Sequence, residues 1–189
     1  PGYESKTTGG SLYYNAKSGN CYSGQSNATK ACNFTSTGIK NATTRNLISD
    51  TIYYLGGHNS FSVYPNQIYE KERGTTVYSG RPTEWTGKIA LAYPSDYGYA
   101  ADLGKCSQNL NNYNNSTCTS NNWMKAIVAP NYGWLLTPRS GIASNVWYVY
   151  SSGGVYYNSY VYNAYGVAPV LFLNSDANVK SGTGTSSDP

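Results

Sequence analysis

Apolar residues alternate with polar ones along the last third of the chain. Residues 134–137 predict a short strand that stops at Pro138, and residues 145–150 and 155–162 predict two more strands joined by a Ser-Ser-Gly-Gly turn. The apolar run 167–173 predicts a buried strand. We therefore expect a C-terminal antiparallel sheet with a hairpin in it.

The central part of the chain mixes helical and strand patterns. Ile48, Ile52 and Leu55 are spaced i, i+4, i+7 before Gly56-Gly57, which predicts a helix over residues 41–55. A second short helix is predicted over residues 66–73, between Pro65 and Gly74.

Residues 85–93 have the period of a strand, and Pro94-Ser95-Asp96 has the composition of a helix start. The Asn-rich segment 105–122 predicts a polar loop outside the core. The expected fold class is α+β and β-rich: one domain over residues 1–175, with two or three short helices, long loops and a loop or linker tail at 176–189. From its abrupt start at Pro1, we expect the chain to lack an N-terminal segment of the full protein.

Charge is scarce in this chain. Charged residues make up 12% of it, and the net charge of +4 is not gathered into a basic run, so we expect no nucleic-acid partner. Asn, Ser, Thr, Gly and Tyr fill the space that charged residues leave, which is typical of exported proteins. No apolar run approaches the roughly 20 residues that cross a bilayer.

The four cysteines form two close pairs in the sequence, Cys21 with Cys32 and Cys106 with Cys118. Neither pair has the Cys-x2-Cys spacing of a zinc site, so two local disulfides are the simplest interpretation, although four cysteines allow three connectivities. Disulfides indicate an oxidising location, and we expect the protein to be extracellular or on the cell surface.

The segment 144–165 holds seven Tyr, four Ser, three Asn and two Gly among its 22 residues, and no charge. This is the composition of antibody-type binding surfaces. We assign Trp134, Trp147, Val149 and Leu171 to the core, so that period two directs other aromatic rings to solvent. The predicted ligand-binding residues are Tyr148, Tyr150, Tyr156, Tyr160, Tyr162, Asn145, Asn158 and Asn163. The alternative is that these tyrosines cover a half-exposed sheet as structural packing.

Catalytic chemistry has few candidates. His58 is the only histidine, and it lies far in sequence from Ser140 and Ser144. The segment around Trp147 contains no acid that could hold Ca²⁺. We expect no catalytic residues, no metal site and no cofactor.

Several motifs resemble a known family. They are Trp134-Leu135-Leu136-Thr137-Pro138, Asn145-Val146-Trp147-Tyr148-Val149, Gly166-Val167-Ala168-Pro169-Val170-Leu171-Phe172-Leu173 and Tyr93-Pro94-Ser95-Asp96-Tyr97-Gly98. Together they resemble a C-terminal domain of unknown function that is common in exported proteins of gut-associated Gram-positive bacteria. The resemblance covers nearly the whole chain and implies export.

The order of elements is more distantly similar to the C-type-lectin-like folds of the formylglycine-generating-enzyme group and of the variable proteins of diversity-generating retroelements. This similarity implies a C-type-lectin-like domain, with residues 144–165 as a candidate hypervariable segment. The paired active-site cysteines of the enzyme group have no counterpart after Cys118. The expected function is a non-catalytic surface or secreted ligand-binding or adhesion module, with a protein or glycan ligand on a cell surface. The alternative is a self-assembling subunit of a pilus-like fibre, and an enzyme is the least favoured class.

Overall fold

The computed structural model describes residues 41–161, 163, 165–177 and 181 in full. Of the first 40 residues it describes only the backbone of four short strands, which pair as two antiparallel ribbons. The strands are β1 (Gly2–Ser5), β2 (Leu12–Asn15), β3 (Asn20–Tyr22) and β4 (Ala28–Ala31). The predicted disulfide between Cys21 and Cys32 lies outside the described side chains.

A three-stranded antiparallel sheet forms the centre of the described chain. Its strands are β8 (Gly133–Pro138), β9 (Asn145–Val149) and β10 (Val155–Tyr160), in the order β10-β9-β8. The predicted hairpin is confirmed, and its turn closes with a hydrogen bond from Gly153 N–H to the Tyr150 carbonyl at 2.7 Å.

Two smaller antiparallel pairs accompany this sheet. β5 (Thr51–Tyr54) pairs with β6 (Glu84–Gly87), and β7 (Ile89–Leu91) pairs with β11 (Pro169–Leu171). The strand predicted over residues 85–93 is therefore interrupted at Lys88, whose ammonium donates to the Ile48 carbonyl at 2.6 Å.

The predicted helix over residues 41–55 is wrong. Helix α2 covers only Ala42–Asn46, capped by the Asn41 side chain, and β5 begins at Thr51. Tyr53 and Leu55 are buried while Ile52 and Tyr54 are exposed, which is the period of a strand. The helical spacing of apolar residues here is coincidental, because β-branched and aromatic residues favour the strand.

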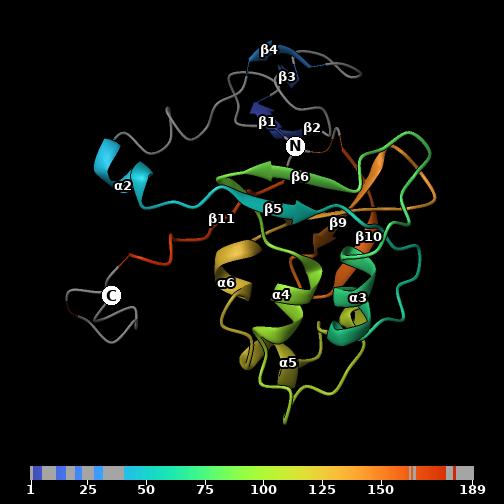
Figure 1. The fold of residues 1–189 in the computed structure, drawn as a ribbon. Helices are drawn as coiled ribbons and strands as arrows, with labels where there is room; N and C mark the ends of the chain where they lie inside the picture. Colours follow the sequence, from blue (N-terminus) through green and yellow to red (C-terminus); the bar gives the residue numbers. More distant parts are fainter. Residues whose placement is uncertain are drawn as a thin grey trace.

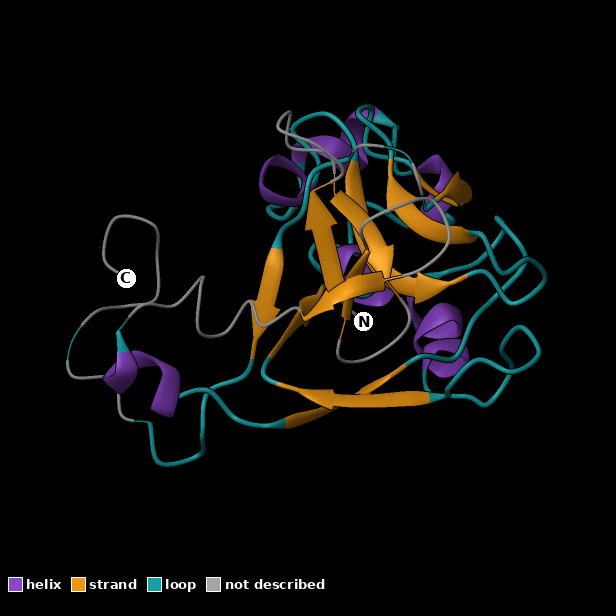
Figure 2. Ribbon diagram, turned by 90° about the horizontal axis from the view of Figure 1, so that it is seen from above, coloured by secondary structure: helices purple, strands orange, loops and turns teal. Residues whose placement is uncertain are grey.

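The other helices are short. Helices α3 (Pro65–Glu72) and α4 (Pro94–Tyr99) confirm the two predicted helix starts. Asp96 caps α4 by accepting a hydrogen bond from Tyr93 N–H at 2.9 Å. In Figure 1, α3, α4, α5 (Ser116–Ser120) and α6 (Lys125–Val128) lie together on one side of β5 and β6, whereas α2 lies apart. Figure 2 shows most of the strands in the middle of the molecule, one strand pair along its lower edge, and helices at several places around them.

Strands β8 and β9 of the central sheet are buried on both faces. Leu135, Trp147 and Val149 pack into one hydrophobic core, together with residues of the helices and of the Asn-rich loop. Trp134, Leu136, Val146 and Tyr148 alternate with them and pack into a second core against β5 and β7. The prediction that Trp134, Trp147 and Val149 are core residues is confirmed.

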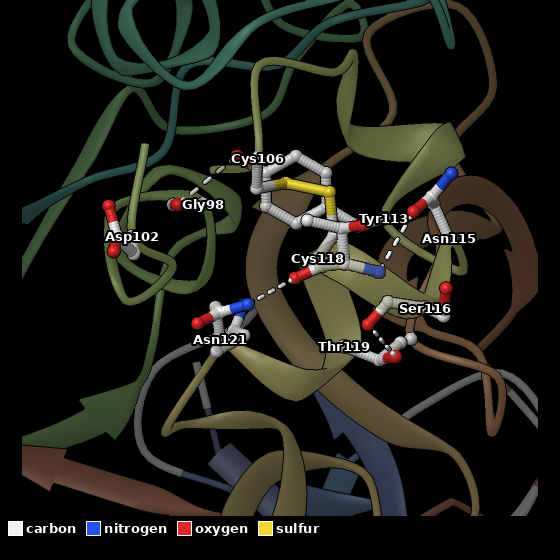
Figure 3. Close-up of a disulfide and its surroundings, with 12 residues drawn as sticks. Gly98, Asp102, Cys106, Tyr113, Asn115, Ser116, Cys118, Thr119 and Asn121 are labelled. Carbon is white, nitrogen blue, oxygen red and sulfur yellow. Dashed lines mark hydrogen bonds between the residues drawn. A yellow bond between two sulfur atoms is a disulfide. The ribbon is translucent and has the colours of Figure 1, made fainter. Parts of the chain in front are cut away.

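The Asn-rich segment is part of the first core rather than a polar loop outside it. The Cys106–Cys118 disulfide is present as predicted, and Leu110 and Tyr113 inside its loop are fully buried. Figure 3 shows the Tyr113 ring beside the disulfide, and its hydroxyl donates to the Gly98 carbonyl at 3.2 Å. The loop also contains the 3₁₀ helix η1 (Leu110–Asn112). An Asn-rich composition therefore does not indicate a loop outside the core here.

The C-terminal apolar run differs from its prediction. Only Pro169–Leu171 form a strand, and Leu171, Phe172 and Leu173 are 41%, 53% and 58% exposed. Assigning Leu171 to the core is therefore wrong. The segment continues past β11 to pair with residues 47–49, and the outer faces of these side chains have no covering layer in the described part of the chain.

The mixed helix and sheet content agrees with the α+β class. In the part of the chain that the structure describes, none of the helices has the length and apolar character required to span a membrane.

Candidate ligand-binding surface

The predicted site residues divide by exposure. Tyr150 and Tyr160 are 39% and 47% exposed, Asn158 is also exposed, and Tyr156 and Asn163 are half-buried. Tyr148 and Asn145 are only 8% and 4% exposed. Tyr162 lies outside the described residues.

The expectation that Tyr148 and Asn145 face solvent is wrong, because β9 has no solvent face. Tyr148 packs in the second core, where burial raises its pKa to about 12. The Asn145 carbonyl accepts a hydrogen bond from Arg139 N–H at 3.0 Å and so joins the end of β8 to the start of β9. Both residues support the hairpin rather than offer contact surface.

A β-bulge changes which tyrosines share a face. Tyr156 pairs with Tyr148, but after a register shift Tyr160 pairs with Asn145. The two partner positions on β9 are three residues apart, so they point to opposite faces. Period two predicts that Tyr156 and Tyr160 share a face, and this is wrong because the bulge separates them.

The exposed rings form a continuous series, which we call the aromatic belt. Neighbouring ring centroids are 4.7 Å apart for Tyr132 and Tyr150, 6.1 Å for Tyr150 and Tyr156, 5.6 Å for Tyr156 and Phe61, and 4.1 Å for Phe61 and Tyr157. All five rings are exposed or half-buried. The belt crosses β10, an edge strand of the central sheet.

Half-buried and buried rings support the belt from the core side. Tyr165 stacks on Tyr132 at 4.8 Å and packs on Trp134 at 4.5 Å, and Tyr157 lies 5.5 Å from Trp147. The Tyr156 hydroxyl donates to the Asn111 carbonyl at 3.2 Å, which connects the belt to the disulfide loop. Hydrogen bonding to Tyr150 is the main reason that the pKa of Tyr132 is raised. These contacts restrict the rotamers of the exposed rings.

His58 has the geometry of a packing residue. Its imidazole stacks on Trp147 with centroids 6.4 Å apart. Burial, and secondarily the charge of Lys71, lower the pKa of His58 and favour the neutral form at pH 7. Within the described part of the chain its imidazole makes no hydrogen bond to a Ser or Asp side chain, as a nucleophile–base pair would require.

One buried carboxyl group has a strongly perturbed pKa. Glu72 accepts hydrogen bonds from the Ser95 N–H, at 2.9 Å, and from the Ser95 hydroxyl, and burial raises its pKa to about 8. Glu72 and Ser95 both have no exposed surface. The pair therefore joins the end of α3 to the start of α4 and has no access to a substrate. Among the described residues no group of three His, Cys, Asp or Glu could hold a metal ion.

Sequence reasoning misses three of the five belt residues. Period two assigns Tyr157 to the face opposite Tyr156, and the structure agrees, since Tyr157 packs on the first core and Tyr156 on the second. Tyr157 joins the belt through Phe61, which contacts both rings. Tyr132 directly precedes β8, so its position beside the hairpin is a usable signal. Phe61 comes from a loop almost a hundred residues away, and no sequence pattern indicates it. Comparisons of the chain with family models, with curated proteins and with solved structures find no match.

Proposed function

We propose that the chain is a non-catalytic, exported ligand-binding or adhesion module with a C-type-lectin-like arrangement, whose contact surface is the aromatic belt. The observation that carries this proposal is the series of ring contacts from Tyr132 to Tyr157, in which every ring keeps exposed surface. Contiguous exposed aromatic surface marks interaction sites more often than isolated rings do.

The chemistry of the belt suits recognition. Tyrosine combines a large ring, for contact with apolar groups or sugar faces, with a hydroxyl that hydrogen bonds. Rings already fixed by their neighbours lose little side-chain entropy on binding, which leaves more of the contact energy as affinity. The ligand would be a protein or a glycan on a cell surface.

Two further observations support the proposal. The Cys106–Cys118 disulfide agrees with an oxidising location outside the cytosol. The order of a strand, a Pro-Ser-Asp helix start, an aromatic hairpin and a final strand is the order of the C-type-lectin-like folds that the sequence resembles. The resemblance to exported bacterial domains implies the same location.

Binding of the purified chain to glycan and protein arrays tests the proposal, with Tyr150→Ala and Phe61→Ala as belt variants. Loss of an anchoring ring costs more than about 1 kcal/mol, so we expect each variant to bind at least about fivefold more weakly. Tyr78→Ala is the matched control, because Tyr78 is similarly exposed and makes no ring contact in the described chain. Wild-type affinity in both belt variants, with unchanged melting temperatures, would contradict the proposal.

The candidate hypervariability of residues 144–165 is constrained by burial. Because all of β9 is buried, we propose that variation is confined to exposed positions such as Tyr150, Asn158 and Tyr160. Sequencing copies of the gene in related strains tests this, and substitutions spread evenly over β9 and its flanks would refute it.

A second function, assembly into a fibre, is favoured by the exposed apolar edge at Leu47, Phe172 and Leu173. These residues are adjacent, since Ser49 N–H donates to the Phe172 carbonyl and Asn174 N–H to the Leu47 carbonyl, both at 2.8 Å. Size-exclusion chromatography and electron microscopy of the isolated chain test this alternative. Filaments that disappear with Phe172→Ser and Leu173→Ser favour it, and a monomer at all concentrations contradicts it.

A further inference from the structure

Beside the aromatic belt lies a cationic side chain with no acidic partner in the described chain. Arg139 is half-buried at the end of β8, and its Nε donates to Asn59 Oδ1 at 2.6 Å. Its Cζ lies 4.6 Å from the ring centroid of Tyr157. Among the described residues Arg139 forms no ion pair, and its two terminal nitrogens make no hydrogen bond.

The backbone around Arg139 is fixed. Residues 58 and 139 form a parallel bridge, and Ser140 N–H donates to the His58 carbonyl at 3.4 Å. Gly57 lies so close to this segment that a Cβ there would be 2.7 Å from the Pro138 carbonyl oxygen. The guanidinium is therefore presented from a packed junction of two segments rather than from a mobile loop.

The electrostatic surroundings favour an anion. The charge of Lys71 reaches His58, where it contributes, after burial, to the lowered pKa of the imidazole, and residue 58 pairs with Arg139. An Arg held on a ring face keeps its charge and loses part of its hydration, which strengthens its pairing with a carboxylate. Its two terminal nitrogens, which make no hydrogen bond to the described residues, suit a planar, two-oxygen acceptor.

Neutral recognition groups lie next to this cation. Asn59 is exposed and Ser140 is half-exposed, and such amides and hydroxyls suit the hydroxyl groups of a sugar. The Phe61 ring, stacked on Tyr157 at 4.1 Å, is also half-exposed. An acidic peptide would need several cations, whereas one Arg beside rings and amides matches a sugar that carries one carboxylate.

We propose that Arg139 anchors the carboxylate of an acidic sugar, with the Phe61 end of the aromatic belt against the sugar ring. The inference rests on the proposed binding function and names the ligand class of the same surface. Asn59 holds the guanidinium in place and is a positioning residue.

The test is isothermal titration of the full chain with two matched pairs of probes, oligogalacturonate against its methyl ester and sialyllactose against lactose. We expect at least one acidic probe to bind about tenfold or more tightly than its neutral partner, with an affinity that falls as salt is raised. Arg139→Gln should remove that preference while leaving the affinity for the neutral probe unchanged. Arg139→Lys should keep part of the preference for the acidic probe, because the positive charge remains. It should not keep all of it, because a single ammonium cannot present two parallel donors.

Arg81→Gln is the matched control, since it removes the same charge from a side chain without a partner in the described chain. Thermal melts confirm that each variant is folded. Equal binding of acidic and neutral probes, an acid preference that survives Arg139→Gln, or tighter binding of poly-glutamate than of any sugar would overturn the inference. If acidic and neutral probes bind equally, or if Arg139→Gln keeps the acid preference, a loss of affinity in Tyr150→Ala would still support the proposed binding function. The absence of binding to any probe or array ligand would refute both the acidic-sugar inference and the binding function.

Discussion

The Gly153→Ala substitution tests how closely the hairpin turn packs against the disulfide loop. This residue has φ of +101°, and a Cβ there would lie 2.8 Å from Thr119 Cγ2 and 3.1 Å from the Tyr113 carbonyl oxygen. The Gly153 carbonyl also accepts a hydrogen bond from the buried Tyr97 hydroxyl at 3.1 Å. Gly153→Ala should therefore strain the backbone and push the turn away from the disulfide loop.

The expected magnitude has two parts. A residue with a Cβ in the left-handed region costs about 1–2 kcal/mol, and forcing a methyl group into a packed site costs about 1–3 kcal/mol more. Gly80 separates the two parts, because it has φ of +77° but a Cβ added there would meet no described atom within 4 Å. We expect Gly80→Ala to cost only the first part.

Urea denaturation of the oxidised protein, followed by tryptophan fluorescence, gives both free energies of unfolding. The prediction is that Gly153→Ala is less stable than Gly80→Ala by about 1–3 kcal/mol. Because Gly153 N–H bonds to the Tyr150 carbonyl, the same variant should also weaken binding at the belt. Equal destabilisation by Gly153→Ala and Gly80→Ala would refute the claim that the turn packs tightly against the disulfide loop.

Three other predictions concern the same framework. Reduction of the Cys106–Cys118 disulfide, whose cysteines are 12 residues apart, should lower the free energy of unfolding by about 3 kcal/mol, and a melting temperature unaffected by reductant would contradict this. Tyr97→Phe should cost about 1 kcal/mol in urea denaturation, because the Gly153 carbonyl loses its buried donor, and wild-type stability would argue against that bond. Burial raises the pKa of Glu72 from 4.5 to about 8, so folding favours its protonated form; this stabilisation is complete below pH 4.5 and is lost as pH rises through about 8. The free energy of unfolding of wild type relative to Glu72→Gln should then fall by about 1.4 kcal/mol per pH unit across that interval, and a pH-independent difference would show that Glu72 is ionised in the folded protein.

The parts of the fold that follow one local period are predictable from the sequence. The hairpin, the core positions of Trp134 and Trp147, and the Pro-initiated helices each rest on residues within a few positions of one another. The Cys106–Cys118 disulfide is predictable because the four cysteines form two pairs that are each close in sequence, here 12 residues apart. At residues 41–55 local periodicity misleads, because the helical spacing groups Ile52 with Leu55, whereas the strand buries Tyr53 with Leu55 and exposes Ile52.

The candidate site is less predictable, because exposure depends on partners distant in sequence. Tyr148 has the parity of an exposed residue in an isolated hairpin, and only the second core, built partly from β5 and β7, buries it. The bulge after Tyr156 is a tertiary feature that moves Tyr160 to the other face. Phe61 and Arg139 contact Tyr157 from separate segments, and no spacing in the sequence predicts these contacts.

The burial of β9 on both faces has a practical consequence. A synthetic peptide that spans only the hairpin would expose two apolar faces at once, and an isolated two-stranded hairpin is marginally stable in water even with one. Such a peptide would aggregate or lose its register before it displayed the rings in their native order. The smallest useful reagent derived from this surface is therefore the entire domain with its disulfide formed, and epitope mapping with overlapping peptides would fail to detect the site.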